Sequence, residues 1–174
     1  MTCRWTCALI GVVLVLSTTG RAEEKAKLHT QQVRLLVPIP EIKRRLGTDD
    51  ATPLADYTKS IQKSATEFWE KQPKPKADGL LITIGIKPGK KARVWCEAIG
   101  GDIRTEVLKD LEERLGKLTA IDTKENFAYS LECRLGDKEV KGFPIVPKAW
   151  TDAAKAAMTP PVIPDEMFPL IWKD

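Results

Sequence analysis

The chain has 174 residues, a length that suits one domain with or without tails. Hydrophobic residues make up 43% and charged residues 30%, which is typical of a globular protein with a solvated surface. The formal net charge is only +4, too small for the concentrated basic footprint that nucleic-acid binding requires, so we expect no nucleic-acid partner.

Residues 1–22 have the pattern of a secretory signal peptide. Arg4 supplies a positive start, an apolar run follows from Ala8 to Leu16, and Gly20-Arg21-Ala22 provides small residues before a cut. The run is far below the roughly 20 residues that a spanning helix needs, so we expect cleavage, with a retained anchor as the alternative. Cleavage lowers the charge from +4 to +2, because Arg4 and Arg21 are removed and no acid is. The mature protein is then expected to be periplasmic or secreted, without a transmembrane anchor.

Residues 23–51 are predicted to form an N-terminal extension. Within it, Gln32–Val37 is a candidate strand that Pro38 ends, and Glu41–Leu46 is a candidate helical turn that Gly47 closes. His29 has no acid, cysteine or serine partner in any motif, so we expect it to be a surface residue.

A single α+β domain is predicted at residues 52–158, and apolar spacing defines its elements. Steps of three or four residues predict helices at about 52–70 and 103–118. Period-two alternation predicts strands at about 80–86, 92–98 and 127–135, the first two joined by the turn Lys87-Pro88-Gly89-Lys90.

These elements predict a two-layer sandwich. The hairpin strands are antiparallel, and the helix after them returns the chain before the third strand begins. Numbering the three strands in chain order, we expect a three-stranded antiparallel sheet of order 2-1-3 with the two helices on one face. Beyond it, residues 148–158 suggest a short Ala-rich helix. The Pro-rich tail at 159–174 is expected to run extended across its own domain, or else to serve as an arm for a partner.

Only Cys96 and Cys133 remain after signal removal, and their spacing and the single histidine fit no zinc pattern. Order 2-1-3 places their strands about 9–10 Å apart, beyond disulfide reach, so we favour two reduced thiols. A Cys96–Cys133 disulfide is the alternative if the second and third strands are neighbours.

The helix–strand–turn–strand–helix–strand order, with the segment Ile82-Thr-Ile-Gly-Ile-Lys-Pro-Gly-Lys-Lys-Ala-Arg-Val94, resembles the periplasmic C-terminal domain of TonB-like proteins. The resemblance covers residues 52–135 at most. The chain departs from that family in lacking a long Pro-rich spacer, so no partner or functional residue is carried over. The resemblance implies an exported location and a protein-binding role.

No catalytic or nucleotide-binding motif is present, and we expect no cofactor and no metal. The leading hypothesis is a non-catalytic protein-interaction or envelope-assembly module. One alternative is a hydrolase that uses carboxylates on the second sheet face, and another is a binder of anionic surfaces through the basic hairpin tip. Candidate binding residues lie at the tip or on that face: Lys87, Lys90, Lys91, Arg93, Trp95, Glu97, Glu132 and Arg134.

Overall fold

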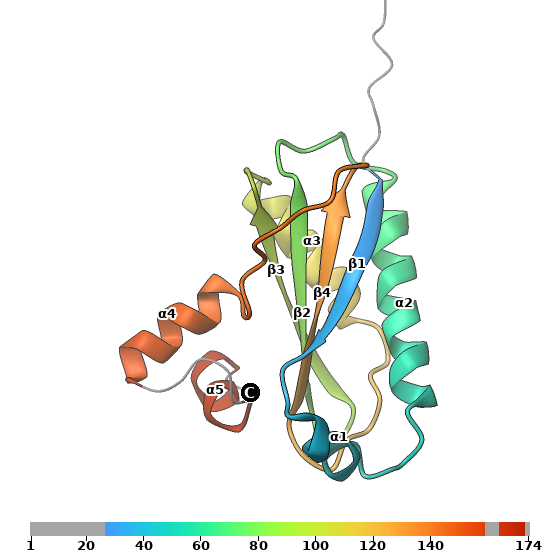
Figure 1. Cartoon of the computed structure of the whole chain (residues 1–174), viewed down its shortest axis with the longest axis vertical. Coiled ribbons are helices and arrows are strands. Elements are labelled where there is room, and N and C mark those ends of the chain that lie inside the picture. The colour runs from blue at the N-terminus through green and yellow to red at the C-terminus, as the bar shows by residue number, and fades with distance from the viewer. Residues whose placement is uncertain (1–26, 159–163, 173–174) are drawn as a thin grey trace, which may run out of the picture.

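The computed structural model describes residues 27–158 and 164–172. The predicted signal peptide, residues 1–22, lies outside these residues. A twisted antiparallel sheet forms the centre, with helices on both of its faces (Figure 1). The strands are β1 (Leu28–Leu35), β2 (Gly79–Lys87), β3 (Lys91–Ile99) and β4 (Phe127–Leu135). The helices are α1 (Ile39–Leu46), α2 (Thr52–Trp69), α3 (Thr105–Gly116), α4 (Lys148–Ala157) and α5 (Pro164–Ile171).

The prediction of a three-stranded sheet with two helices on one face is wrong. The sheet has four strands in the order β1-β4-β2-β3, and the described residues form five helices. The three strands predicted from alternation do keep their predicted relative order, because β2 lies between β3 and β4 and is antiparallel to both. The fourth strand, β1, comes from the predicted N-terminal extension.

Strand β1 was not placed in the sheet because its sequence does not alternate regularly. It pairs antiparallel with β4, and the register shifts between Thr30 and Gln32. Such a bulge inserts one unpaired residue and exchanges the faces toward which odd and even positions point. Leu28 and Thr30 therefore share a face with Val33 and Leu35, and no single period of two runs through the strand.

The first core lies between the sheet and the helices α2 and α3. Its strand residues are those of the predicted apolar stripes, among them Leu80, Ile82, Ile84 and Ile86, each 0% exposed. Ile61 of α2 and Leu111 of α3 are also 0% exposed and face them. Burying one such aliphatic side chain stabilises the fold by about 1.5–3 kcal/mol, so this layer supplies much of the driving force for folding.

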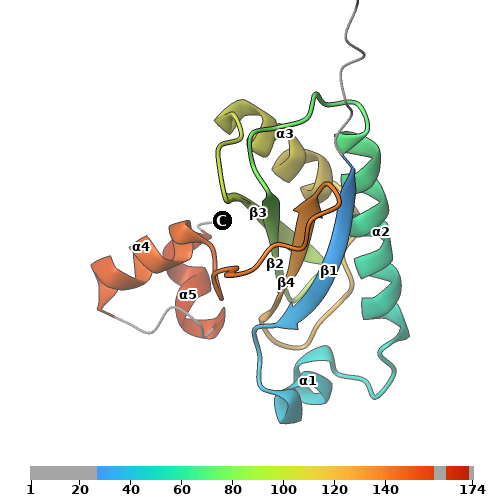
Figure 2. The same cartoon turned by 45° about the horizontal axis from the view of Figure 1, so that its top comes forward.

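Helices α4 and α5 lie on the opposite face of the sheet (Figure 2), and a second core of buried side chains lies beneath them. The pair packs on Trp95 and Ala128 of the sheet through Trp150 of α4 and Phe168 of α5. The C-terminal segment is thus helical over Pro164–Ile171, not extended as predicted, and it packs on its own sheet. Residues 159–163 lie outside the described part of the chain.

Arg45 connects α1 to α5. Its side chain is buried and donates to Glu41 at 2.7 Å, to the carbonyl of Asn126 at 2.8 Å and to Asp165 at 2.8 Å. The hydrogen bond to Asp165 is the main cause that raises the pKa of this guanidinium, so the charge is retained despite burial. Asp165 lies in the first turn of α5, where a carboxylate also offsets the helix dipole.

Candidate functional site

Helices α4 and α5 cover much of the sheet face on which most of the predicted site residues lie. We predicted that face to be exposed, but every residue of β2 from Gly79 to Ile86 is buried, and so is every residue of β4 except Arg134. The prediction of an exposed face is wrong because polar residues on this face bond to each other and can therefore be buried. Thr83 and Ser130, both 0% exposed, share a hydrogen bond of 2.9 Å between their hydroxyls.

Trp95 belongs to a buried aromatic cluster. Its ring packs edge-on against Trp150 at a centroid distance of 5.3 Å and against Trp172 at 6.3 Å. Trp150 in turn meets Phe168 edge-on at 5.9 Å. Edge-to-face pairs of this kind are worth about 0.5–1.5 kcal/mol each beyond the area they bury, so Trp95 anchors the C-terminal helices.

The two carboxylates of the hydrolase hypothesis are both engaged in structural contacts. Glu97 accepts the backbone N–H of Lys148 at 2.7 Å, at the start of α4. Glu132, whose side chain is 8% exposed, forms an ion pair with Arg34 of β1. Arg34 also donates to the carbonyl of Pro144 at 3.4 Å, which holds the loop after β4 against the sheet.

Arg134 lies beside this region and bonds locally. Its guanidinium donates to the carbonyl of Asp137 at 3.0 Å, in the loop that follows β4. Together with the contacts of Glu97 and Glu132, this bond means that the charged residues of the face hold loops and helices in place.

Two of the four basic residues at the hairpin tip contact the C-terminus of α5. Lys87 donates to the carbonyl of Trp172 at 3.2 Å and lies 4.6 Å from the centroid of its ring. Arg93 donates to the carbonyl of Ile171 at 2.8 Å. Cations at a helix C-terminus satisfy its last carbonyls and its dipole. Lys90, Lys91 and Arg93 are exposed, but only Lys90 and Lys91 of the four tip cations make no contact with the described residues at the C-terminus of α5.

The cysteines are free and lie on the two sides of β2. Cys96 of β3 lies opposite Ile82 of β2, and Cys133 of β4 lies opposite Leu80 on the other side of β2. Burial raises the pKa of the Cys133 thiol to about 12 and raises that of Cys96 strongly. A protonated buried thiol is a poor nucleophile and a poor metal ligand. The described residues contain no cluster of three or more histidine, cysteine or acidic side chains that suits a metal ion.

Strand β1 leaves one edge of the sheet without a neighbouring strand among the described residues. The N–H of Leu36 bonds to the carbonyl of Ala128, so the antiparallel ladder directs the N–H and C=O groups of Val33 and Leu35 away from β4. The side chains of Val33 and Leu35 are 45% and 36% exposed, and that of Ile39, just beyond the strand, is 79% exposed. This edge combines unpaired backbone groups with exposed apolar side chains.

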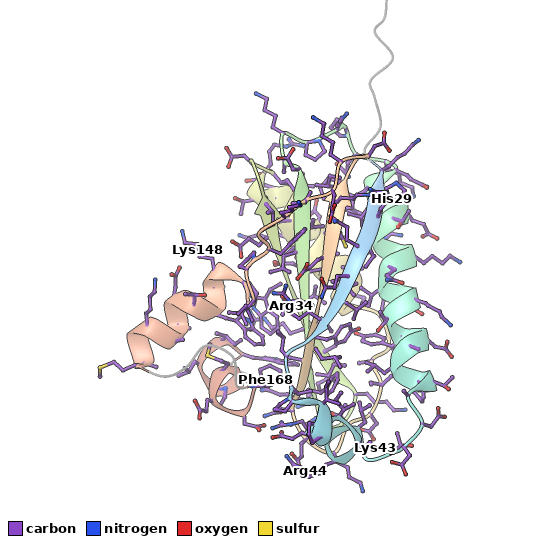
Figure 3. The ribbon with its side chains drawn as sticks, viewed as in Figure 1. His29, Arg34, Lys43, Arg44, Lys148 and Phe168 are labelled. Atoms are coloured by element: carbon purple, nitrogen blue, oxygen red, sulfur yellow. The ribbon has the colours of Figure 1, made fainter. Side chains whose placement is uncertain are left out.

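The segment that forms this edge contains basic residues and no acid, although Arg34 is already paired with Glu132. Residues 27–40 include Lys27, His29 and Arg34 and no acid. Figure 3 shows His29 and Arg34 near opposite ends of β1. The sequence predicts an N-terminal extension here, and the candidate strand at Gln32–Val37 is its only local sign of a sheet edge.

A cleft of about 570 Å³ lies between the connector that follows α2 and the start of α3. Its apolar wall includes Trp69, Ile103 and Val107, and its polar wall includes Lys76 and Arg104. The sequence of the connector, residues 72–76, indicates only a break between two elements. Nothing in the local pattern shows that it meets the residues before α3, because that meeting is a tertiary contact.

Two close backbone contacts build this cleft. Lys76 and Asp102 form an isolated antiparallel bridge, and the N–H of Asp102 donates to the carbonyl of Lys76 at 3.3 Å. Gly101 has φ +154°, and a Cβ there would lie 1.7 Å from the Lys76 oxygen. Only glycine allows this approach, so Gly101 fixes the connector against the loop before α3.

Comparisons of the chain with protein-family models, with curated proteins and with solved structures found no match. The resemblance to TonB-like domains therefore stays a prediction. No helix in the described part of the chain is long and apolar enough to cross a membrane.

Proposed function

We propose that this chain is an exported, non-catalytic protein-interaction domain that binds an extended segment of a partner protein along β1. The observation that carries the proposal is the open sheet edge, where the outward N–H and C=O groups of Val33 and Leu35 accompany exposed apolar side chains. Natural proteins usually cover or blunt such an edge, because it recruits other strands. An added strand would receive backbone hydrogen bonds from β1 and apolar contacts from alternate side chains.

The charge along β1 favours an acidic segment over a second copy of this chain. Residues 27–40 contain no carboxylate, and because Arg34 is already paired with Glu132, the basic groups available to a partner are Lys27 and His29. Pairing of two β1 strands would bring these basic groups together, which costs free energy across a strand pair. The hydrolase hypothesis is less well supported, since Glu97 and Glu132 are engaged by Lys148 and Arg34.

The test removes one outward donor. Leu35→Pro deletes the N–H that would bond to a partner strand, at an edge where proline is tolerated, and Leu35→Ala is the matched control that keeps the N–H. The purified protein serves as bait in an envelope extract. We expect a partner that is retained by the wild type and by Leu35→Ala and is lost with Leu35→Pro. Binding of that partner should slow hydrogen exchange at the Val33 and Leu35 amides.

Two outcomes would contradict the proposal. A partner retained equally by Leu35→Pro would bind elsewhere on the protein. Self-association of the purified chain in sedimentation velocity, abolished by Leu35→Pro, would show that β1 pairs with a second copy.

A further inference from the structure

The cleft beside α3 carries unpaired positive charge from two segments. Lys76 comes from the connector and Arg104 from the residue before α3, and neither forms an ion pair or hydrogen bond with a side chain among residues 27–158 and 164–172. Lys74 also lines the cleft, and Asp102 is the one acid among the lining residues. The cleft therefore carries a net positive charge, with three basic residues and one acid in its lining.

The first turn of α3 adds to this potential. The helix has 12 residues and begins at Thr105, and its N-cap residue, Arg104, provides no side-chain hydrogen bond to the first turn. The first N–H groups of a helix have no partner inside the helix and carry its positive dipole end. An anion in the cleft can accept hydrogen bonds from this turn, as at other helix N-termini.

Trp69 supplies an independent sign that the cleft accommodates a ligand. Its side chain is 1% exposed and lines the cleft, and its indole Nε1 has no hydrogen-bond partner in the described structure. A buried donor without an acceptor is unfavourable, and an acceptor supplied by a ligand would remove that cost. The ring also offers an apolar surface, which Ile103 and Val107 extend.

We propose that this cleft binds a small organic monoanion, a carboxylate with an apolar body. The carboxylate would lie between Lys76, Arg104 and the first turn of α3 and would accept a hydrogen bond from the indole N–H of Trp69. The apolar body would pack against the Trp69 ring, Ile103 and Val107. Asp102 disfavours a second negative charge on the ligand, which is why a monoanion suits the cleft better than a dianion such as a phosphate monoester. The site uses no residue of β1 and does not depend on the protein-interaction role.

The experiment uses three probes that share a phenyl group: phenylacetate, benzyl alcohol and phenyl phosphate. Each is titrated into the purified ¹⁵N-labelled protein, and the indole Nε1–H resonance of Trp69, assigned with Trp69→Phe, is followed by NMR. The test variant is Lys76→Gln/Arg104→Gln. The matched control is Lys63→Gln/Lys141→Gln, which removes two exposed lysines outside the cleft.

Phenylacetate should shift the Trp69 indole and the Thr105 amide in a saturable way and bind more tightly than benzyl alcohol. Two lost charge-assisted contacts should weaken it about tenfold or more in Lys76→Gln/Arg104→Gln, and the control should bind like the wild type. Binding should also weaken with added salt. The proposal is overturned if no probe gives a saturable shift, if benzyl alcohol binds as tightly as phenylacetate, if phenyl phosphate binds more tightly, or if the control loses affinity equally.

Discussion

The carboxylate of Glu97 on β3 accepts the backbone N–H of Lys148, the first residue of α4, at 2.7 Å. This is one of the unpaired N–H groups at the start of the helix, and Pro147 before it provides no side-chain cap. A negative charge there also complements the helix dipole. Glu97 thus fixes the point at which the chain, after crossing the sheet, begins α4 at Lys148, which Figure 3 labels.

Removal of the Glu97 carboxylate should loosen α4. We expect Glu97→Ala to lower the free energy of unfolding by about 1–2 kcal/mol, in the range of other lost helix caps. Glu97→Gln should cost less, because its amide oxygen still accepts the N–H of Lys148 and only the charge is lost. Urea denaturation measures both, with exposed Glu139→Ala as a control expected to change stability little. A Glu97→Ala variant as stable as the control would show that the bond does not hold α4.

Two tip cations should control the C-terminus of α5. Lys87 and Arg93 bind the carbonyls of Trp172 and Ile171, so Lys87→Met/Arg93→Met should let the last turn of α5 open more often. We expect hydrogen exchange in α5 to rise about tenfold for each 1.4 kcal/mol lost, while exchange in β2 stays unchanged. Lys90→Met/Lys91→Met, at the same tip, is the matched control and should leave α5 unaffected. Equal effects from the two double variants would contradict this role.

Period-two alternation predicted β2, β3 and β4 well because their apolar stripes are uninterrupted. Ile82 and Ile84 lie in the first core as expected, and the order of the three strands follows from the chain reversal made by α3. The same method missed the place of β1 in the sheet. Its bulge between Thr30 and Gln32 changes the face of every later residue, so a fixed period cannot describe it.

The candidate site was less predictable than the fold. Glu97 and Glu132 look like solvated strand charges in the sequence, because their partners, Lys148 and Arg34, lie far away along the chain. Polar residues on one face usually indicate solvent, and here they are buried in pairs instead. The only local sign of the cleft in the sequence is the Gly100-Gly101 pair. Its meaning depends on the distant carbonyl of Lys76.

Both cysteines should behave as protonated free thiols and not as a disulfide. Because burial raises the pKa of Cys133 to about 12 and that of Cys96 strongly, almost no thiolate exists at neutral pH. We expect little reaction with a thiol reagent in the native protein and reaction of both residues in denaturant without reductant. A pair that is released in denaturant only after reduction would show a Cys96–Cys133 disulfide and a different strand order.

Glu112 of α3 should make stability depend on pH. Its carboxylate accepts the N–H of Cys96 at 2.7 Å on the outer edge of β3, and its partial burial raises its pKa above the ordinary glutamate value. The folded state therefore holds this proton more tightly than the unfolded chain does. Its contribution to stability is full below the unfolded pKa, near 4.3, and falls as the pH rises through the higher folded pKa.

Glu112→Gln removes this dependence and keeps an oxygen that can accept the N–H of Cys96. We expect the variant to gain stability relative to the wild type as the pH rises above about 4.3, and the gain to level off once the pH exceeds the raised folded pKa of Glu112. Urea denaturation at several pH values measures the difference, with the exposed neighbour Glu113→Gln as control. If the variant instead lost stability relative to the wild type as the pH rose, the charged carboxylate would be the form that the fold favours, and burial would not dominate at this position.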